Sequence, residues 1–184
     1  MAKHIVEGHA IVSVEGAIAD AGGVMPQALR NEADWAWFQG RLDASDLTAL
    51  GRLGHAANPN FRRRRRLVFS ARGRGLEPID DLAHRLNPND MPIAEALSEL
   101  LPQGGHIAIA GGTGVFDAFL EYGYSAFHLT IAGRARIVGG RPVFSGVGSA
   151  AEAEAKLVAA GLFLQEMRLL DPANDVVLKI FARA

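Results

Sequence analysis

The sequence predicts a single-domain α/β protein in which a mainly parallel central sheet is flanked by helices and ends in an antiparallel C-terminal hairpin. Apolar runs of strand length alternate with segments of helical spacing, and a glycine-rich turn at 111–114 joins a buried run to a helical one. Turn residues at 171–175 separate the last two strand-like segments. Alternating strands and helices are typical of parallel sheets, whereas a short turn between two strands predicts a hairpin.

The first half of the chain is predicted to hold three strands and two helices. Strands are expected at residues 10–14, 47–51 and 67–70, the second leading into a turn or short helix near Arg52. The small residues of 15–23 predict a mobile loop, which ends at Met25-Pro26. Helices are expected up to about residue 42 and, after Pro92, at 93–101.

The second half repeats the alternation. A strand at 106–110 enters the glycine turn, a helix follows at 115–121, and further strands are expected at 126–131 and ending at Val143-Phe144. Ser149 and Glu152 form a capping box for an alanine-rich helix that extends to residue 160. The segments 162–170 and 176–181 then form the hairpin.

Composition narrows the function classes. A chain of 184 residues fits one domain, here residues 1–184, and a formal net charge of −1 argues against general affinity for nucleic acid or an anionic membrane. The absence of cysteine excludes disulfides, thiolate metal sites and cysteine nucleophiles, and favours a cytoplasmic location. The six histidines show no metal-ligand spacing, so no metal site is predicted. The expected partner is a small molecule, and the oligomeric state stays open.

The first long helix carries an acid among aromatic residues. Asn31 can cap this helix, and Asp34 shares a face with Trp37 and Phe38 at the spacings of three and four residues. An apolar wall raises the pKa of a carboxyl group, whereas the positive end of the helix lowers it. Asp34 is therefore a candidate proton donor, and the alternative is an ordinary first-turn acid on a core helix.

Two further segments could bind anions. The glycines of 111–114 allow backbone amides to approach a phosphate at a helix N-terminus, although the segment lacks the full dinucleotide fingerprint and a purely structural turn is the alternative. Five consecutive arginines at 62–66 precede a strand, so they cannot all face one ligand. Most are expected to be solvated or ion-paired, while one or two could clamp a carboxylate or phosphate.

Taken in order, four stretches resemble dihydrofolate reductases. Residues 9–19, with Met25-Pro26, resemble the first strand and the active-site loop, and 33–38 resemble the acid-bearing helix. Residues 67–70 resemble the strand before the adenosine site, and 109–116 with 129–131 resemble the glycine turn and a later strand. The chain is thereby identified as a divergent member of this family, which includes reductases of related pterins such as dihydromethanopterin.

This resemblance implies an NADPH-dependent reductase that gives a tetrahydropterin. Asp34 would promote protonation of the pterin with Thr130 as its hydrogen-bond partner, while Ile11, Phe38 and Arg64 would contact the substrate. The resemblance implies that ten further residues contact the cofactor: Ile18, Ala19, Arg52, Ser70, Arg72, Gly111, Gly112, Thr113, Gly114 and Phe116.

Two departures from the family pattern leave alternatives open. Gln27 stands where the family usually has tryptophan, and Leu53-Gly54 follows Gly51-Arg52 where a threonine is expected. Residues 133–144 are also similar to the end of bacterial pyrimidine reductases of riboflavin synthesis. The alternatives are therefore such a pyrimidine reductase, a noncatalytic nucleotide or pterin binder, and an interaction protein that uses the arginines.

Overall fold

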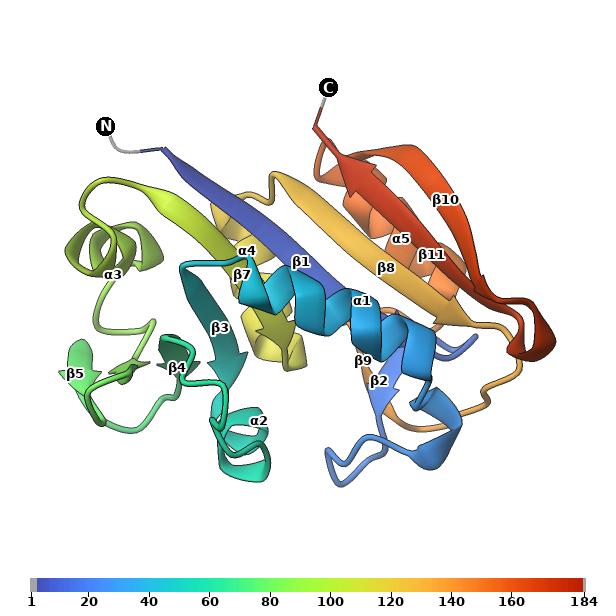
Figure 1. Ribbon diagram of the computed structural model, residues 1–184, viewed down its shortest axis with the longest axis horizontal. Helices are drawn as coiled ribbons and strands as arrows, with labels where there is room; N and C mark the ends of the chain where they lie inside the picture. The colour runs from blue at the N-terminus through green and yellow to red at the C-terminus, as the bar shows by residue number, and fades with distance from the viewer. Residues whose placement is uncertain (1–2, 184) are drawn as a thin grey trace.

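A twisted sheet forms the centre of the computed structural model, which describes residues 3–183 (Figure 1). Within these residues nine strands follow the order β10-β11-β8-β1-β7-β3-β4-β6-β5, and β2 pairs with β9 in a separate ribbon. The strands are β1 (His4–Val12), β2 (Ala17–Ala19), β3 (Leu47–Gly51), β4 (Arg66–Phe69), β5 (Leu76–Pro78), β6 (Ala83–Leu86), β7 (Gly105–Gly111), β8 (Ala126–Ala132), β9 (Arg141–Pro142), β10 (Phe163–Asp171) and β11 (Val176–Ala182).

The middle of the sheet is parallel and its two edges are antiparallel. β1 lies between β7 and β8 and runs parallel to both, while β11 pairs antiparallel with β8 and with β10. On the other side β5 pairs antiparallel with β6. The carboxyl ends of β1, β3, β4 and β7 therefore lie along one edge of the sheet, where ligands bind in open α/β folds.

Helices cover both faces of the sheet. Figure 1 shows α1 crossing in front of β1 and β8, with α4 and α5 behind the sheet. The α-helices are α1 (Glu32–Asp43), α2 (Arg52–Ala57), α3 (Ile93–Leu100), α4 (Thr113–Tyr122) and α5 (Ala150–Ala159), and the 3-10 turns are Gln27–Leu29 and Pro172–Asn174. Among residues 3–183, no helix is long and apolar enough to cross a membrane.

Aromatic side chains fill the core behind the sheet. Phe127 packs against Phe116, Tyr124 and Phe144, with ring centroids 5.5, 5.1 and 5.3 Å away. Gly8 makes this packing possible, because a Cβ at that position would lie 2.2 Å from the Phe127 ring. The sheet and α4 are thus locked together behind β1, which leaves the α1 face for other contacts.

The predicted fold class and most elements are confirmed, with three corrections. The segment 15–23, expected to be a mobile loop, contains β2, which pairs with β9. The strand expected to end at Val143-Phe144 is instead β9, and both of those side chains are buried beyond it. β5 and β6 were not predicted, since each has only three or four residues and depends on its partner strand.

Candidate functional site

Asp34 lies in the first turn of α1, and a cap fixes the start of that helix. The Asn31 side chain accepts hydrogen bonds from the backbone N–H groups of Ala33 and Asp34, both at 3.1 Å. This bond pattern satisfies two donors that the first helical turn leaves free. The predicted cap is therefore confirmed, and it holds the backbone of Asp34 itself.

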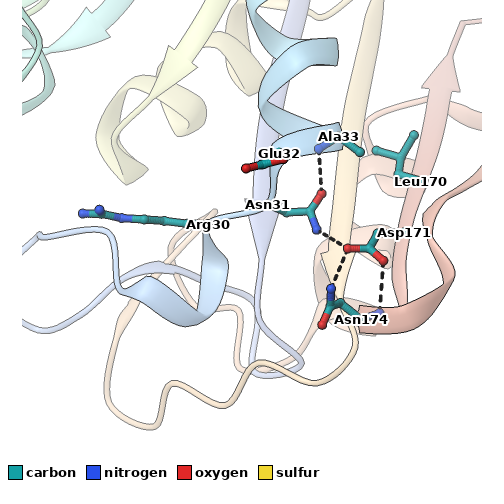
Figure 2. Close-up of a pocket in the computed structure, with 7 residues that line it drawn as sticks. All are labelled: Arg30, Asn31, Glu32, Ala33, Leu170, Asp171 and Asn174. Atoms are coloured by element: carbon teal, nitrogen blue, oxygen red, sulfur yellow. Dashed lines mark hydrogen bonds between the residues drawn. The ribbon is translucent and has the colours of Figure 1, made fainter.

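A second contact ties this cap to the C-terminal hairpin. Asn31 Nδ2 donates to Asp171 Oδ2 at 2.8 Å, and Asp171 also accepts from Asn174 in the hairpin turn (Figure 2). An open groove of about 450 Å³ lies here, lined by Arg30, Asn31, Glu32, Ala33, Leu170, Asp171 and Asn174. The polar contacts in the groove fasten α1 to the end of β10.

The carboxyl group of Asp34 is held in an unusual electrostatic setting. Burial raises its pKa above the ordinary value, and a hydrogen bond from the Thr130 hydroxyl partly opposes the shift. Thr130 is only 1% exposed and pairs in register with Ile11 of β1. The structure thus brings together Asp34 from α1, Thr130 from β8 and Ile11 from β1.

The aromatic residues after Asp34 do not form one continuous wall. Phe38 packs near His9, with ring centroids 6.0 Å apart, whereas Trp35 is 54% exposed. The Trp37 indole donates to His128 Nδ1 at 3.2 Å, and the Arg168 guanidinium lies 4.7 Å from its ring centroid. The surroundings of α1 are therefore partly polar, in contrast to the apolar wall that its sequence predicts.

The glycine turn lies where β7 meets α4. Gly111 and Gly112 have φ angles of 120° and 90°, a region that favours glycine. A Cβ built on Gly114 would meet no atom within 4 Å in residues 3–183, so the first turn of α4 is open to a ligand. Thr113 Oγ1 donates to the Pro142 carbonyl at 2.5 Å, which fixes the start of the helix against β9.

Three other predicted cofactor residues follow the neighbouring strands. Arg52 follows β3 and is exposed, while Ser70 and Arg72 follow β4. The Ser70 hydroxyl accepts from the backbone N–H of Arg72 at 3.1 Å and so shapes this turn. In the sheet β3 lies between β4 and β7, and Leu50 pairs with Gly111.

The turns after β3, β4 and β7 can be compared with what the phosphates of a dinucleotide require. Along one edge of the sheet they combine two glycines with positive φ, an open helix N-terminus and two exposed arginines. Backbone N–H groups and guanidinium groups are the donors that phosphates require. The residues present are compatible with a phosphorylated nicotinamide nucleotide.

Comparison with solved structures assigns the fold. A dihydrofolate reductase from Enterococcus faecalis, complexed with NADP(H), superposes with a TM-score of 0.66 at 14% identity, over 97% of this chain and 96% of its own. A putative riboflavin biosynthesis protein from Shewanella sp. PV-4 gives a TM-score of 0.67 at 14% identity, over 98% and 99% of the two chains. The chain has the dihydrofolate reductase-like fold.

This fold also occurs as one part of a longer protein. A diaminohydroxyphosphoribosylaminopyrimidine deaminase/5-amino-6-(5-phosphoribosylamino)uracil reductase from Thermotoga maritima matches 99% of this chain with a TM-score of 0.67 at 15% identity, but the match spans 57% of that protein. At the sequence level, neither a protein-family model nor a curated protein matches. Identities this low establish the dihydrofolate reductase-like fold alone.

Within this fold the predicted substrate arginine is already engaged by the protein. Arg64 donates from Nε to Asp43 Oδ1 at 3.0 Å and from Nη2 to Gln39 Oε1 at 2.8 Å, both on α1. Three of the other four arginines of the run bond Asp43, the Leu100 carbonyl and the Asn58 carbonyl. The expectation that most of the run is solvated or ion-paired agrees with these contacts.

Three more residues expected to contact the cofactor, Ile18, Ala19 and Phe116, occupy different environments. Phe116 is 1% exposed and lies within the aromatic core, so it supports Gly111 from behind and offers little surface to a ligand. Ile18 and Ala19 belong to β2, where Ala19 pairs with Arg141 of β9. The segment that carries them is further tied by Glu15, which accepts from Ser13 and from the Ile137 N–H.

A cluster of histidines on the α1 side of the sheet was missed by the sequence analysis. Glu7, His9 and His128 bring potential ligand atoms within 4.8 Å of one another. Glu7 and His9 lie two residues apart on β1, so they share a face, but β1 spans His4–Val12 and the strand predicted at 10–14 left both residues out. The register that places His128 beside them depends on the pairing of β1 with β8, and no local spacing reveals it.

Proposed function

We propose that the protein is an NADPH-dependent reductase that transfers a hydride to the C=N bond of a 7,8-dihydropterin, either dihydrofolate or a close analogue such as dihydromethanopterin. The observation that carries this proposal is the half-buried carboxyl of Asp34 beside Thr130, whose pKa is raised by burial. A carboxyl whose pKa moves toward neutrality can hold and deliver a proton under conditions where an exposed aspartate is ionised.

In this proposal four residues on α1, β1 and β8 bind the pterin or position the group that protonates it. Asp34 binds the amino group of the pteridine ring and promotes protonation of N5, directly or through water. Thr130 fixes the carboxyl, and Ile11, which pairs with Thr130, borders the ring. Phe38, one turn after Asp34, contacts the ring or its tail.

The cofactor would lie along the carboxyl ends of the parallel strands. NADPH would supply the hydride when bound. Gly111, Gly112, Thr113 and Gly114 would hold its pyrophosphate at the start of α4, while Ile18 and Ala19 would flank the nicotinamide. Arg52, Ser70 and Arg72 would hold a 2′-phosphate, which distinguishes NADPH from NADH.

A pyrimidine reductase of the riboflavin synthesis type is the second candidate. It is favoured by one observation in particular: Arg64, which would hold the carboxylate tail of a folate, bonds Asp43 and Gln39 instead. A substrate without that carboxylate tail does not require those bonds to break. The two candidates share the NADPH site and differ in the ring that faces Asp34.

The test measures NADPH oxidation with dihydrofolate, dihydromethanopterin and the phosphoribosylaminopyrimidine substrate, together with NADPH binding by calorimetry. We expect turnover of a dihydropterin. Turnover of the pyrimidine alone would support the second candidate instead. NADPH binding without turnover of any substrate would indicate a noncatalytic protein. Asp34→Asn should lower kcat by about 10²–10⁴-fold and leave NADPH affinity nearly unchanged. Lower pH should recover part of the loss.

Glu32→Gln is the matched control, because Glu32 is an exposed acid in the same helical turn. It removes the same charge from the same helix end without changing the half-buried carboxyl of Asp34. Its kcat should stay within about twofold of the parent value, since first-turn acids act mainly through the helix dipole. Equal turnover in Asp34→Asn and Glu32→Gln would remove Asp34 from the mechanism.

A further inference from the structure

Four titratable side chains gather between α1 and the sheet. Glu7 and His9 lie on β1, and His9 pairs in register with His128 of the adjacent β8. His106 lies on β7, on the other side of β1. Three neighbouring strands thus direct an acid and three imidazoles toward the face that α1 covers.

The distances show how closely these groups approach. The Nε2 atoms of His9 and His128 each lie 3.8 Å from Glu7 Oε2, and His106 Nε2 lies 2.9 Å from the same oxygen. The rings of His9 and His128 have centroids 4.5 Å apart. One potential ligand atom of each of Glu7, His9 and His128 lies within 4.8 Å of the others, against about 3–3.5 Å between the ligands of one tetrahedral ion.

The hydrogen bonding of the cluster is incomplete. His9 is 4% exposed, and neither of its ring nitrogens has a hydrogen-bond partner among residues 3–183. His106 Nε2 is also buried without a hydrogen bond, despite its short distance to Glu7. Buried polar atoms without a partner are rare, and these imidazole nitrogens include lone pairs that a metal ion can use.

We propose that Glu7, His9 and His128 bind a divalent transition metal ion such as Zn²⁺, with His106 available as a fourth ligand. Two or three imidazoles and one carboxylate are ligands that suit zinc and its neighbours, whereas Mg²⁺ and Ca²⁺ prefer sites made of oxygen atoms. This site lies outside the proposed reductase chemistry and does not depend on it.

Two existing contacts determine how the ion would enter. Arg41 of α1 bonds Glu7 Oε2, and His106 Nε2 lies 2.9 Å from the same oxygen, so Oε1 can turn to the metal while Oε2 keeps the arginine. Trp37 donates to His128 Nδ1, which leaves the proton of a neutral His128 on Nε2. To bind the metal through Nε2, a neutral His128 must carry its proton on Nδ1 instead. Nδ1 can then no longer accept from Trp37, so that hydrogen bond breaks.

Direct metal titration is the first test. Untagged, chelator-treated protein is titrated with Zn²⁺ and Co²⁺ by calorimetry, with Mg²⁺ as the comparison ion. One Zn²⁺ per chain should bind with a Kd of about 1 μM or below, and Mg²⁺ should not bind at that concentration. His9→Gln and Glu7→Gln should each weaken Zn²⁺ binding at least about tenfold, whereas His84→Gln on the distant β6 should leave it unchanged.

Trp37 provides a second readout that needs no ligand variant. In Trp35→Phe protein the fluorescence comes from Trp37 alone, since the chain has two tryptophans. Zn²⁺ should alter this emission by breaking the bond to His128, and the change should saturate at one equivalent. Adding His9→Gln should shift the change to higher Zn²⁺ concentration by the same factor that calorimetry gives.

Either of two results overturns the proposal: no saturable Zn²⁺ binding near one equivalent, or binding that His9→Gln and Glu7→Gln leave intact. Circular dichroism confirms that each variant is folded, and the Trp35→Phe titration still decides if both ligand variants are not. Because these readouts do not use reductase turnover, a failed metal site and a failed reductase assignment give different results.

Discussion

Removal of the Asn31 side chain tests whether the start of α1 positions Asp34. In Asn31→Ala two backbone N–H groups lose their acceptor, those of Ala33 and Asp34, and Asp171 loses a donor at 2.8 Å. Loss of an N-cap costs about 0.5–2 kcal/mol, and the three lost bonds place this variant in the upper half of that range. For a chain of this size each kcal/mol lowers Tm by roughly 2–4 °C.

The matched control is Ser149→Ala on α5. The Ser149 hydroxyl accepts from the Glu152 N–H at 3.1 Å, so this variant also loses an N-cap, but on a helix that carries no proposed site residue. Both variants should lower Tm in thermal unfolding, Asn31→Ala by the larger amount. Only Asn31→Ala should also lower kcat, by about tenfold, because a small misplacement of Asp34 weakens proton delivery.

Asn31→Ser separates the two contacts of Asn31. A serine hydroxyl can accept from the first-turn N–H groups, but it is too short to keep the bond to Asp171. We expect recovery of most of the stability and part of kcat. The reasoning is refuted if Asn31→Ala retains full kcat while Tm falls, or if it is no less stable than Ser149→Ala.

Two other perturbations follow from the site. Burial raises the pKa of Asp34, so its ionisation opposes folding: the cost is absent below its unfolded pKa of about 3.9 and grows as pH rises through the higher folded pKa. Asp34→Asn should therefore have a higher Tm than the parent at neutral pH, and this gain should vanish near pH 3. If the difference in Tm between the two proteins is the same at both pH values, the carboxyl is not desolvated. Gly112→Ala forces alanine to a φ of 90° and should cost about 1–3 kcal/mol and weaken NADPH binding, while Gly40→Ala, in the open interior of α1, should leave binding unchanged.

The parts of the fold that were predicted correctly are those with local signals. The run before Gly111, the turn itself and α4 follow one another within a few residues, and the Asn31 cap depends on its own helix. The hairpin of β10 and β11 has strong turn residues between two apolar segments. In each case the residues that decide the structure are neighbours in sequence.

The parts that were missed depend on pairing between distant segments. β2 exists only because it meets β9, more than a hundred residues later, so its small residues read as a loop. The burial of Arg66 and its bond to the Asn58 carbonyl are equally invisible within a run of arginines. The histidine cluster combines three strands whose order in the sheet is not their order in the chain.

Helix α1, which carries Asp34, shows why the candidate site also depends on contacts that local sequence does not reveal. Of the residues in α1 only Leu42 is buried, so the helix has no continuous apolar stripe to dock it on the sheet. Polar contacts hold it instead: Asn31 to Asp171, Trp37 to His128 and Arg41 to Glu7. An apolar stripe would hold the helix equally at any pH, whereas these contacts depend on the charge of their partners. The helix that carries Asp34 is therefore held by contacts whose strength follows the protonation of Asp171, His128 and Glu7.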